Sequence, residues 1–252
     1  MHAINSFLIS LSSSTRGAIW YAFILLLVMI ACILTGIYCF KKFNSGRKSF
    51  VCCWLSAASF ALVIGVALLV EHLTDDVILL SGVTYFVPYL ICASWMISKY
   101  LNCSFVETFD LIALAYLPAR AVNIIGCTFS GCCQGIPVEW GIYSSILKTR
   151  VVPVQLYESA AIFVIWTVIN HCFRKHLITT PGKCAAWSIT LFGGLNVITD
   201  IFTYIQPKII YMVSVEGIFS FITMSIGLIL LYYFSKNEKT NQSCVSSCKG
   251  LK

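Results

Sequence analysis

The chain has 252 residues, of which 59% are hydrophobic and only 11% are charged, and its mean hydropathy is +0.87. Soluble domains carry about 25% charged residues, so this composition excludes an ordinary soluble domain and indicates an integral membrane protein. The net charge of +7 does not indicate a nucleic-acid partner, because the basic residues flank apolar runs. The 13 cysteines follow no spacing of a secreted disulfide scaffold, and many lie within apolar runs, where thiols behave as small hydrophobic groups.

Seven apolar runs are long enough to be membrane-spanning helices, each of which needs about 20 mostly apolar residues. The runs are Ile19–Phe40, Phe50–Val70, Val77–Ser98, Phe105–Phe129, Val152–Cys172, Cys184–Ile205 and Ile210–Phe234. Only Gln206-Pro207-Lys208-Ile209 separates the last two, which predicts a tight helical hairpin. The sequence therefore predicts an all-α, seven-helix membrane domain over residues 1–235, followed by a polar tail over residues 236–252, with disorder from Ser235 onward.

The distribution of Lys and Arg predicts the orientation of these helices. With the N-terminus outside, the inner segments hold twelve Lys and Arg residues and the outer segments hold four. Positively charged loops stay on the cytoplasmic side, so we expect the N-terminus outside and the C-terminus inside. The first run lacks a strongly basic leading segment and a small-residue cleavage site, which favours a retained anchor over a removed signal peptide.

Polar residues interrupt four of the runs, and this topology places them at one depth in the outer half of the membrane. A charge at the bilayer centre costs about 2.5–3.5 kcal/mol on insertion scales, so such residues need a partner or a function. Each has a structural alternative: Arg120 can snorkel or pair with one acid, and Asn196 can make an interhelical hydrogen bond. Glu216 is expected about 8 residues, or ~12 Å, into the last helix. The set predicts a polar cavity open to the outer leaflet: Arg120, Asn123, Gln155, Glu158, Asn196, Asp200 and Glu216.

The segment from Gly126 to Val152 reads as a long glycine-rich loop on the oxidising side. Its glycines permit close approach of the backbone to a ligand. Cys127, Cys132 and Cys133 have neither the C-x-x-C spacing of a redox motif nor that of a zinc site, so we expect no metal. A disulfide or close packing of small residues is the default interpretation, and a reactive thiol at Cys132 or Cys133 is the alternative.

Two motifs in this region resemble those of the prolipoprotein diacylglyceryl transferases. They are Gly126-Cys127-x3-Gly131-Cys132-Cys133-x-Gly135 and Pro153-Val154-Gln155-Leu156-Tyr157-Glu158, and the paired cysteines are similar to one branch of that family. The similarity extends to Ser104-Phe105 and Asp110, to Phe192-Gly193-Gly194 and to Ser214–Ser220.

The resemblance implies a seven-helix protein of the bacterial cytoplasmic membrane that needs no cofactor. Members transfer the diacylglyceryl group of phosphatidylglycerol to the cysteine sulfur of a lipobox prolipoprotein and release glycerol phosphate. Such a reaction needs a cation on the phosphate and a group that helps to deprotonate the thiol. From the residues of this chain, rather than from the family pattern, we infer Arg120 as the catalytic cation and Glu158, or Asp200, as its partner or as general base. We expect the lipid and acceptor to contact Asn123, Gly126, Gly131, Gly135, Gln155, Tyr157, Asn196, Asp200 and Glu216.

The chain also departs from the family at several positions. Most members have an arginine where this chain has Ile124, and Arg120 lies one helical turn upstream on the same face. Val152 stands where the family usually has a histidine, and Asn196 where an arginine is expected. These differences support a second hypothesis, a non-catalytic homologue that binds lipid or a partner protein. A third hypothesis is a thiol-dependent enzyme that uses one of the paired cysteines.

Overall fold

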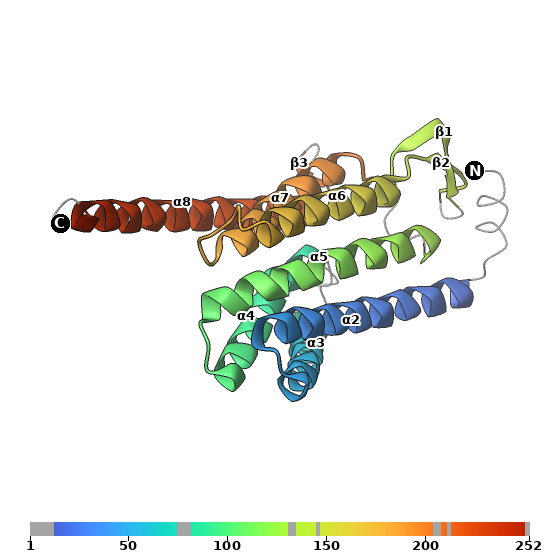
Figure 1. Ribbon diagram of the computed structural model, residues 1–252. Coiled ribbons are helices and arrows are strands. Elements are labelled where there is room, and N and C mark those ends of the chain that lie inside the picture. The colour runs from blue at the N-terminus through green and yellow to red at the C-terminus, as the bar shows by residue number, and fades with distance from the viewer. Residues whose placement is uncertain are drawn as a thin grey trace.

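The computed structural model shows a bundle of long helices, with the hairpin of β1 and β2 at one end and the short strand β3 beside α7 (Figure 1). It describes residues 13–74, 82–130, 135–144, 147–203, 208–210 and 213–249. The helices in these ranges are α2 (Ser13–Phe43), α3 (Gly46–Thr74), α4 (Gly82–Leu101), α5 (Phe105–Ser130), α6 (Val154–Arg174), α7 (Lys183–Ile201) and α8 (Val215–Lys249). The strands are β1 (Pro137–Ser144), β2 (Thr149–Val151), β3 (Lys208–Ile210) and β4 (Val213–Ser214). We call the end of the bundle that carries β1 and β2 the hairpin end.

Six helices are long and apolar enough to cross a membrane, judged by length and composition over the described residues. They are α2, α3, α5, α6, α7 and α8. The remaining helix, α4, has its described apolar part in Phe86–Leu101, which is shorter than such a span. The chain is therefore a mostly helical, multi-pass membrane protein, and the predicted count of seven spans and the orientation of the termini stay predictions.

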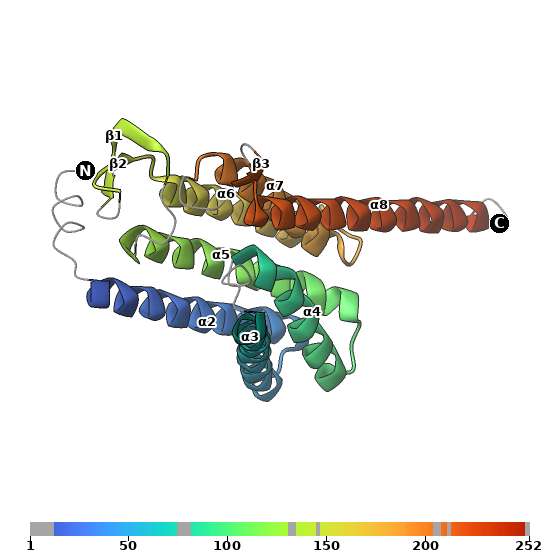
Figure 2. The same ribbon diagram turned by 180° about the vertical axis from the view of Figure 1, so that it is seen from behind.

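Helix α5 is the central helix of the bundle. Its membrane-spanning window is 83% buried inside the protein, whereas the windows of α2, α3, α6 and α8 are between 17% and 28% buried. It contacts α2 on one side and α6 and α7 on the other, and both views show it running between them (Figures 1 and 2). The polar residues of α5 therefore meet those of several other helices.

Aromatic side chains hold the middle of this bundle together. Phe86 of α4 stacks on Tyr116 of α5, with ring centroids 4.8 Å apart, and meets Phe192 of α7 edge-on at 4.7 Å. Tyr89 also packs on Tyr116, and its hydroxyl shares a 2.7 Å hydrogen bond with Ser56 of α3. All four rings are buried. Aromatic pairs of this kind add about 0.5–1.5 kcal/mol each beyond area burial.

Helices α7 and α8 approach each other closely because glycines face the partner backbone. A Cβ at Gly193 would lie 2.6 Å from the amide nitrogen of Met224, and one at Gly227 would meet the backbone of Thr190. Small residues at such crossings let membrane helices pack through backbone contact. Gly194 differs, because a Cβ there would touch only the Met224 sulfur at 3.4 Å.

The prediction of one long loop from Gly126 to Val152 is wrong for most of its described residues. Helix α5 continues to Ser130, as the apolar run Phe105–Phe129 predicted, and β1 and β2 form an antiparallel hairpin further along the chain. Tyr, Trp, Val and Thr favour strands, and hairpins this short leave a weak signal beside the apolar helices. The pairing register shifts between Pro137 and Ile142, and Gly141 lies in this irregularity, where a Cβ would overlap the Val151 carbonyl.

The tight connection expected between the last two helices is also wrong. Helix α7 ends at Ile201, and α8 begins only at Val215, after β3 and β4. Glu216 therefore lies in the first turn of α8 rather than two turns inside it. The predicted disorder from Ser235 onward is wrong as far as Lys249, because α8 continues to that residue and extends well past α6 and α7 (Figure 1). Its 35 residues correspond to about 52 Å, longer than a bilayer core of about 30 Å.

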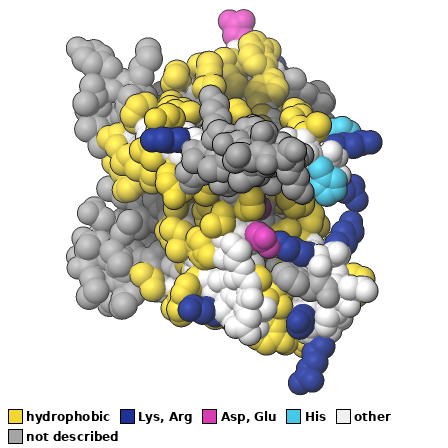
Figure 3. All heavy atoms as spheres, turned by 60° about the vertical axis from the view of Figure 1, so that its left-hand side comes forward, with side chains coloured by type: hydrophobic (Ala, Val, Ile, Leu, Met, Phe, Trp, Pro, Cys, Tyr) yellow, Lys and Arg dark blue, Asp and Glu magenta, His cyan; other side chains and the backbone are white. Residues whose placement is uncertain are grey.

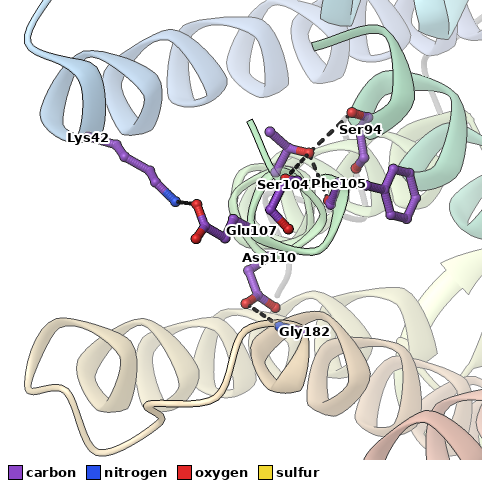
Figure 4. A network of polar contacts seen from close by, with 8 residues as sticks. Lys42, Ser94, Ser104, Phe105, Glu107, Asp110 and Gly182 are labelled. Carbon is purple, nitrogen blue, oxygen red and sulfur yellow. Dashed lines mark hydrogen bonds and ion pairs between the residues drawn. The ribbon is translucent and has the colours of Figure 1, made fainter. Parts of the chain in front are cut away.

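The end of the bundle opposite the hairpins is basic. Exposed Lys and Arg side chains lie at the last turns of α2, α4 and α6 and at the first turn of α3, and Figure 3 shows them around this end. Lys42 of α2 forms an ion pair there with Glu107 of α5. Asp110, one turn further along α5, accepts hydrogen bonds from the backbone nitrogens of Gly182 (2.7 Å) and Ala185 (2.8 Å), and thereby caps α7 (Figure 4).

Candidate functional site

A polar cavity lies between α5, α6, α7 and α8, close to the hairpin end. Its volume is about 40 Å³, roughly the space of one or two water molecules. The cavity is formed by the second half of α5, the first turns of α6 and α8, and the last turns of α7. Its lining residues are Arg120, Ile124, Cys127, Val154, Gln155, Glu158, Asn196, Thr199, Asp200, Thr203 and Glu216.

Arg120 supplies the positive charge of this cavity. It is partly exposed, its Nη1 donates a 2.7 Å hydrogen bond to Asn123 Oδ1, and its Nε is buried without a hydrogen-bond partner among the described residues. Asn123 lies one turn along α5 and is only 5% exposed, so it holds the guanidinium from behind rather than lining the cavity. An arginine fixed in this way retains donors for an incoming anion, since a guanidinium carries five N–H groups.

Helix α6 brings Gln155 and Glu158 to the cavity from its first two turns. The helix begins directly after Pro153, whose carbonyl accepts from the Leu156 nitrogen at 3.0 Å. Residues three apart share a helix face, so Gln155 and Glu158 point the same way. Gln155 is 4% exposed, and its side chain makes no hydrogen bond within the described part of the chain. Ser159 donates to the Ala121 carbonyl at 2.8 Å and ties this face of α6 to α5 beside Arg120.

The opposite wall comes from the end of α7 and the start of α8. Both oxygens of Asp200 bond Ser214: Oδ1 accepts from its hydroxyl at 2.5 Å and Oδ2 from its backbone nitrogen at 3.1 Å. The same hydroxyl accepts from the Gly217 nitrogen at 3.1 Å, which makes Ser214 the N-cap of α8. Asp200 and Ser214 thus fix the helix turn that carries Glu216.

The chain just before the β1–β2 hairpin contacts the end of α7. The Ile136 nitrogen donates to the Phe202 carbonyl at 3.0 Å, and Gly135 forms an isolated bridge with Thr203. A Cβ at Gly135 would overlap the carbonyl of Val152. Gly135 therefore allows the chain before β1 to pack closely on Val152 and beside Thr203, which lines the cavity.

The structure brings six of the predicted site residues together around the cavity: Arg120, Gln155, Glu158, Asn196, Asp200 and Glu216. Asn123 supports this group from behind. Tyr157 lies elsewhere, because its side chain is 56% exposed and does not line the cavity, and Gly126 lies against Phe23 of α2. Gly131, Cys132 and Cys133 lie outside the described residues.

Sequence reasoning missed several residues of the site. Cys127 was considered only as a possible disulfide or packing residue, yet it is 8% exposed and lines the cavity beside Ile124, Thr199 and Thr203. Ser214 was seen only as part of a family-like segment, although a serine just before an apolar helical run with an acid in its first turn is a recognisable N-cap signal. Among the described residues, no group of three His, Cys, Asp or Glu side chains is arranged to hold a metal ion.

Among the described lining residues, the chemistry available at this site is that of one permanent cation beside carboxylates and neutral amides. A guanidinium suits a phosphate group, and a neighbouring carboxylate can accept a proton from a nucleophile. Among known families, the sequence model described as prolipoprotein diacylglyceryl transferase matches residues 16–233. A comparison with curated proteins gives no match. Since the family match covers most of the helical bundle and every residue that lines the cavity, the chain belongs to the prolipoprotein diacylglyceryl transferase family.

Proposed function

We propose that this protein transfers a diacylglyceryl group from phosphatidylglycerol, or a related phospholipid, to the cysteine thiol of a prolipoprotein. The reaction takes place at the outer leaflet of a bacterial cytoplasmic membrane, in the cavity between α5, α6, α7 and α8. The observation that carries the proposal is the convergence of Arg120, Gln155 and Glu158 in that cavity, within a chain of this family.

Arg120 binds the lipid phosphate and stabilises the charge that develops on it as it leaves. Its buried Nε has no partner among the described residues, and a phosphate oxygen would satisfy it. Asn123 holds the guanidinium through Nη1 and so positions the cation before the lipid arrives.

Glu158 accepts the proton of the acceptor thiol. The thiolate then attacks the glyceryl carbon that bears the phosphate ester, the carbon–oxygen bond breaks, and a thioether forms. The bonding pair leaves with the phosphate, which departs as the headgroup phosphate and takes up the proton held by Glu158 or one from water. No oxidant or reductant is required, because the thiolate supplies the electron pair of the new carbon–sulfur bond and the leaving phosphate takes the pair of the broken carbon–oxygen bond.

One further candidate is a homologue that binds lipid without turnover, supported by Ile124, Val152 and Asn196 at positions where the family usually has arginine or histidine. The cavity volume of about 40 Å³ is far below the 300–1,000 Å³ typical of ligand pockets, so under either proposal a headgroup enters only if the walls move. The two proposals differ in a single measurable step, the formation of the thioether.

A complementation experiment tests the transferase proposal. The chain is expressed in a bacterial strain depleted of its own transferase, and a reporter prolipoprotein is examined by mass spectrometry for the diacylglyceryl increment. We expect the increment with the wild type, its loss with Arg120→Ala, and its retention with Arg150→Ala. Arg150 is a matched control, because it is an exposed arginine of β2 that contacts the Glu139 carbonyl away from the cavity.

Two outcomes decide between the candidates. If wild-type protein that is folded in the membrane adds no diacylglyceryl group, the transferase proposal is wrong and the lipid-binding one remains. If Arg120→Ala retains full activity, the assignment of the phosphate-binding cation is wrong.

A further inference from the structure

Tyr116 of α5 carries a buried hydroxyl group that the rest of the fold does not use. Its side chain is only 1% exposed, and its hydroxyl makes no hydrogen bond to another described residue. The hydroxyl lies near enough to the guanidinium of Arg120 for the two groups to interact electrostatically. Buried tyrosine hydroxyls usually have a hydrogen-bond partner, because burying a polar group without one costs free energy. A bound ligand beside Arg120 would supply that partner.

Tyr89, the other tyrosine of the aromatic cluster, differs in this respect. Its hydroxyl shares a 2.7 Å hydrogen bond with Ser56 of α3, and both side chains are fully buried. Phe86 and Tyr89 pack on the ring of Tyr116, with centroids 4.8 Å and 5.4 Å away, so this ring is held in place by its neighbours. The hydroxyl of Tyr89 therefore has a structural role, whereas that of Tyr116 is positioned without one.

Tyr116 and Arg120 lie on the same face of α5, one turn apart, with a rise of about 6 Å between them. Helical side chains lean towards the N-terminal end of their helix, so the guanidinium of Arg120 lies over the turn that carries Tyr116. The Nε atom of Arg120 is itself buried without a hydrogen-bond partner among the described residues. Two donors without acceptors therefore occupy adjacent turns of one helix face.

We propose that the Tyr116 hydroxyl is a second donor to the lipid phosphate, beside Arg120 Nε. This inference rests on the proposed function and adds a phosphate-binding residue to the same site. A phosphate group has several acceptor oxygens, so one group can accept from both donors, and hydrogen bonds to an anion are among the strong ones. Tyr116 is not part of the present lining, so the wall movement that admits a headgroup must also bring the phosphate to its hydroxyl.

A retention experiment tests this second donor without catalysis. Full-length protein is reconstituted with equimolar phosphatidylglycerol and diacylglycerol of identical acyl chains, and native mass spectrometry measures the lipid that stays bound. The basic end of the bundle (Figure 3) attracts anionic lipid nonspecifically, so the readout is the ratio of the two lipids in each variant relative to the wild type. We expect Tyr116→Phe to reduce the preference for phosphatidylglycerol about tenfold, equivalent to about 1.4 kcal/mol. Tyr89→Phe is the matched control and leaves the ratio unchanged.

Thermal unfolding of the same variants separates ligand binding from a structural role. Tyr89→Phe loses the hydrogen bond to Ser56 and should lower the Tm. Tyr116→Phe removes a hydroxyl that bonds no described residue, so its Tm should stay unchanged or rise. If Tyr116→Phe lowers the Tm as much as Tyr89→Phe does, the hydroxyl has a structural partner and the inference is wrong.

A transfer assay with phosphatidylglycerol and a lipobox peptide then measures the same contact during the reaction. We expect Tyr116→Phe to lower kcat/KM about tenfold, mainly through a higher KM for the lipid, because the hydroxyl already contacts the phosphate before the chemical step. If the wild type transfers nothing while Tyr116→Phe still lowers the retention ratio, the transferase proposal fails and the second phosphate donor stands. An unchanged retention ratio in Tyr116→Phe overturns the inference, whatever the rate of transfer.

Discussion

Replacing Ser214 with alanine is expected to destabilise the protein. The same change is expected to displace Glu216, because Ser214 caps the first turn of α8, which carries Glu216. The Ser214 hydroxyl both donates to Asp200 and accepts from the Gly217 nitrogen, and the side chain is 1% exposed, so water cannot take its place readily. Loss of an N-cap costs about 0.5–2 kcal/mol, and loss of a hydrogen bond to a charged group about 1.5–3 kcal/mol. Together these give about 2–5 kcal/mol.

The assay is thermal unfolding in detergent, with diacylglyceryl transfer measured in parallel below the melting temperature. For a chain of this size, 2–5 kcal/mol corresponds to a decrease in Tm of about 4–20 °C. Ser214→Thr is the matched control, because threonine keeps the hydroxyl and is also a good N-cap. We expect Ser214→Thr to remain near the wild type in both measurements. Equal Tm values for the alanine and threonine variants would refute the assignment of Ser214 and Asp200 as the cap of α8.

Three further predictions concern the frame around the site. Asp110→Ala leaves two buried backbone nitrogens at the start of α7 without their acceptor, which costs about 1–3 kcal/mol each. The Tm of this variant should therefore be well below that of Glu107→Ala, which loses only a partly exposed ion pair. Equal melting temperatures would contradict the capping role of Asp110. Gly193→Ala should lower the Tm, because its methyl group would overlap the Met224 backbone. Gly194→Ala should leave the Tm unchanged or raise it. A lower Tm for Gly194→Ala than for Gly193→Ala would mean that α7 and α8 pack differently. The orientation is checked with fusions: alkaline phosphatase should be active after insertion at the β1–β2 turn and inactive at the α2–α3 connection, and the opposite pattern would invert the proposed topology.

The positions of most helices could be predicted from the sequence because a membrane-spanning run is long and strongly apolar. Phe105–Phe129 was expected and α5 is Phe105–Ser130; Val152–Cys172 was expected and α6 is Val154–Arg174. The start of α8 was predicted five residues too early. The stretch from Ile210 to Ser214 is as apolar as the helix that follows, and hydropathy does not separate a short strand from a helical turn.

The composition of the cavity could be predicted in part for a related reason. Polar residues inside apolar runs are rare enough to mark the site, so Arg120, Gln155 and Glu216 were all expected to meet. The sequence pattern does not reveal which of these polar side chains already form hydrogen bonds that hold the start of a helix. Asp200 was expected to bind substrate, yet the structure engages both its oxygens with Ser214, because α8 begins beside it.

Two buried acids of this chain, Asp110 and Asp200, bond backbone nitrogens at the starts of helices. Asp110 caps the start of α7, and Asp200, near the end of α7, holds the cap of α8, so one helix is fixed at both ends by carboxylates that bond backbone nitrogens. Helix N-termini carry partial positive charge, which stabilises both carboxylates in place. Neither is well suited to accept a proton from substrate, because its oxygens already serve as acceptors in the folded protein. In the proposed transfer, Glu158 is the better candidate for the base, because the Ser159 hydrogen bond to the Ala121 carbonyl ties its helix turn to α5 beside Arg120.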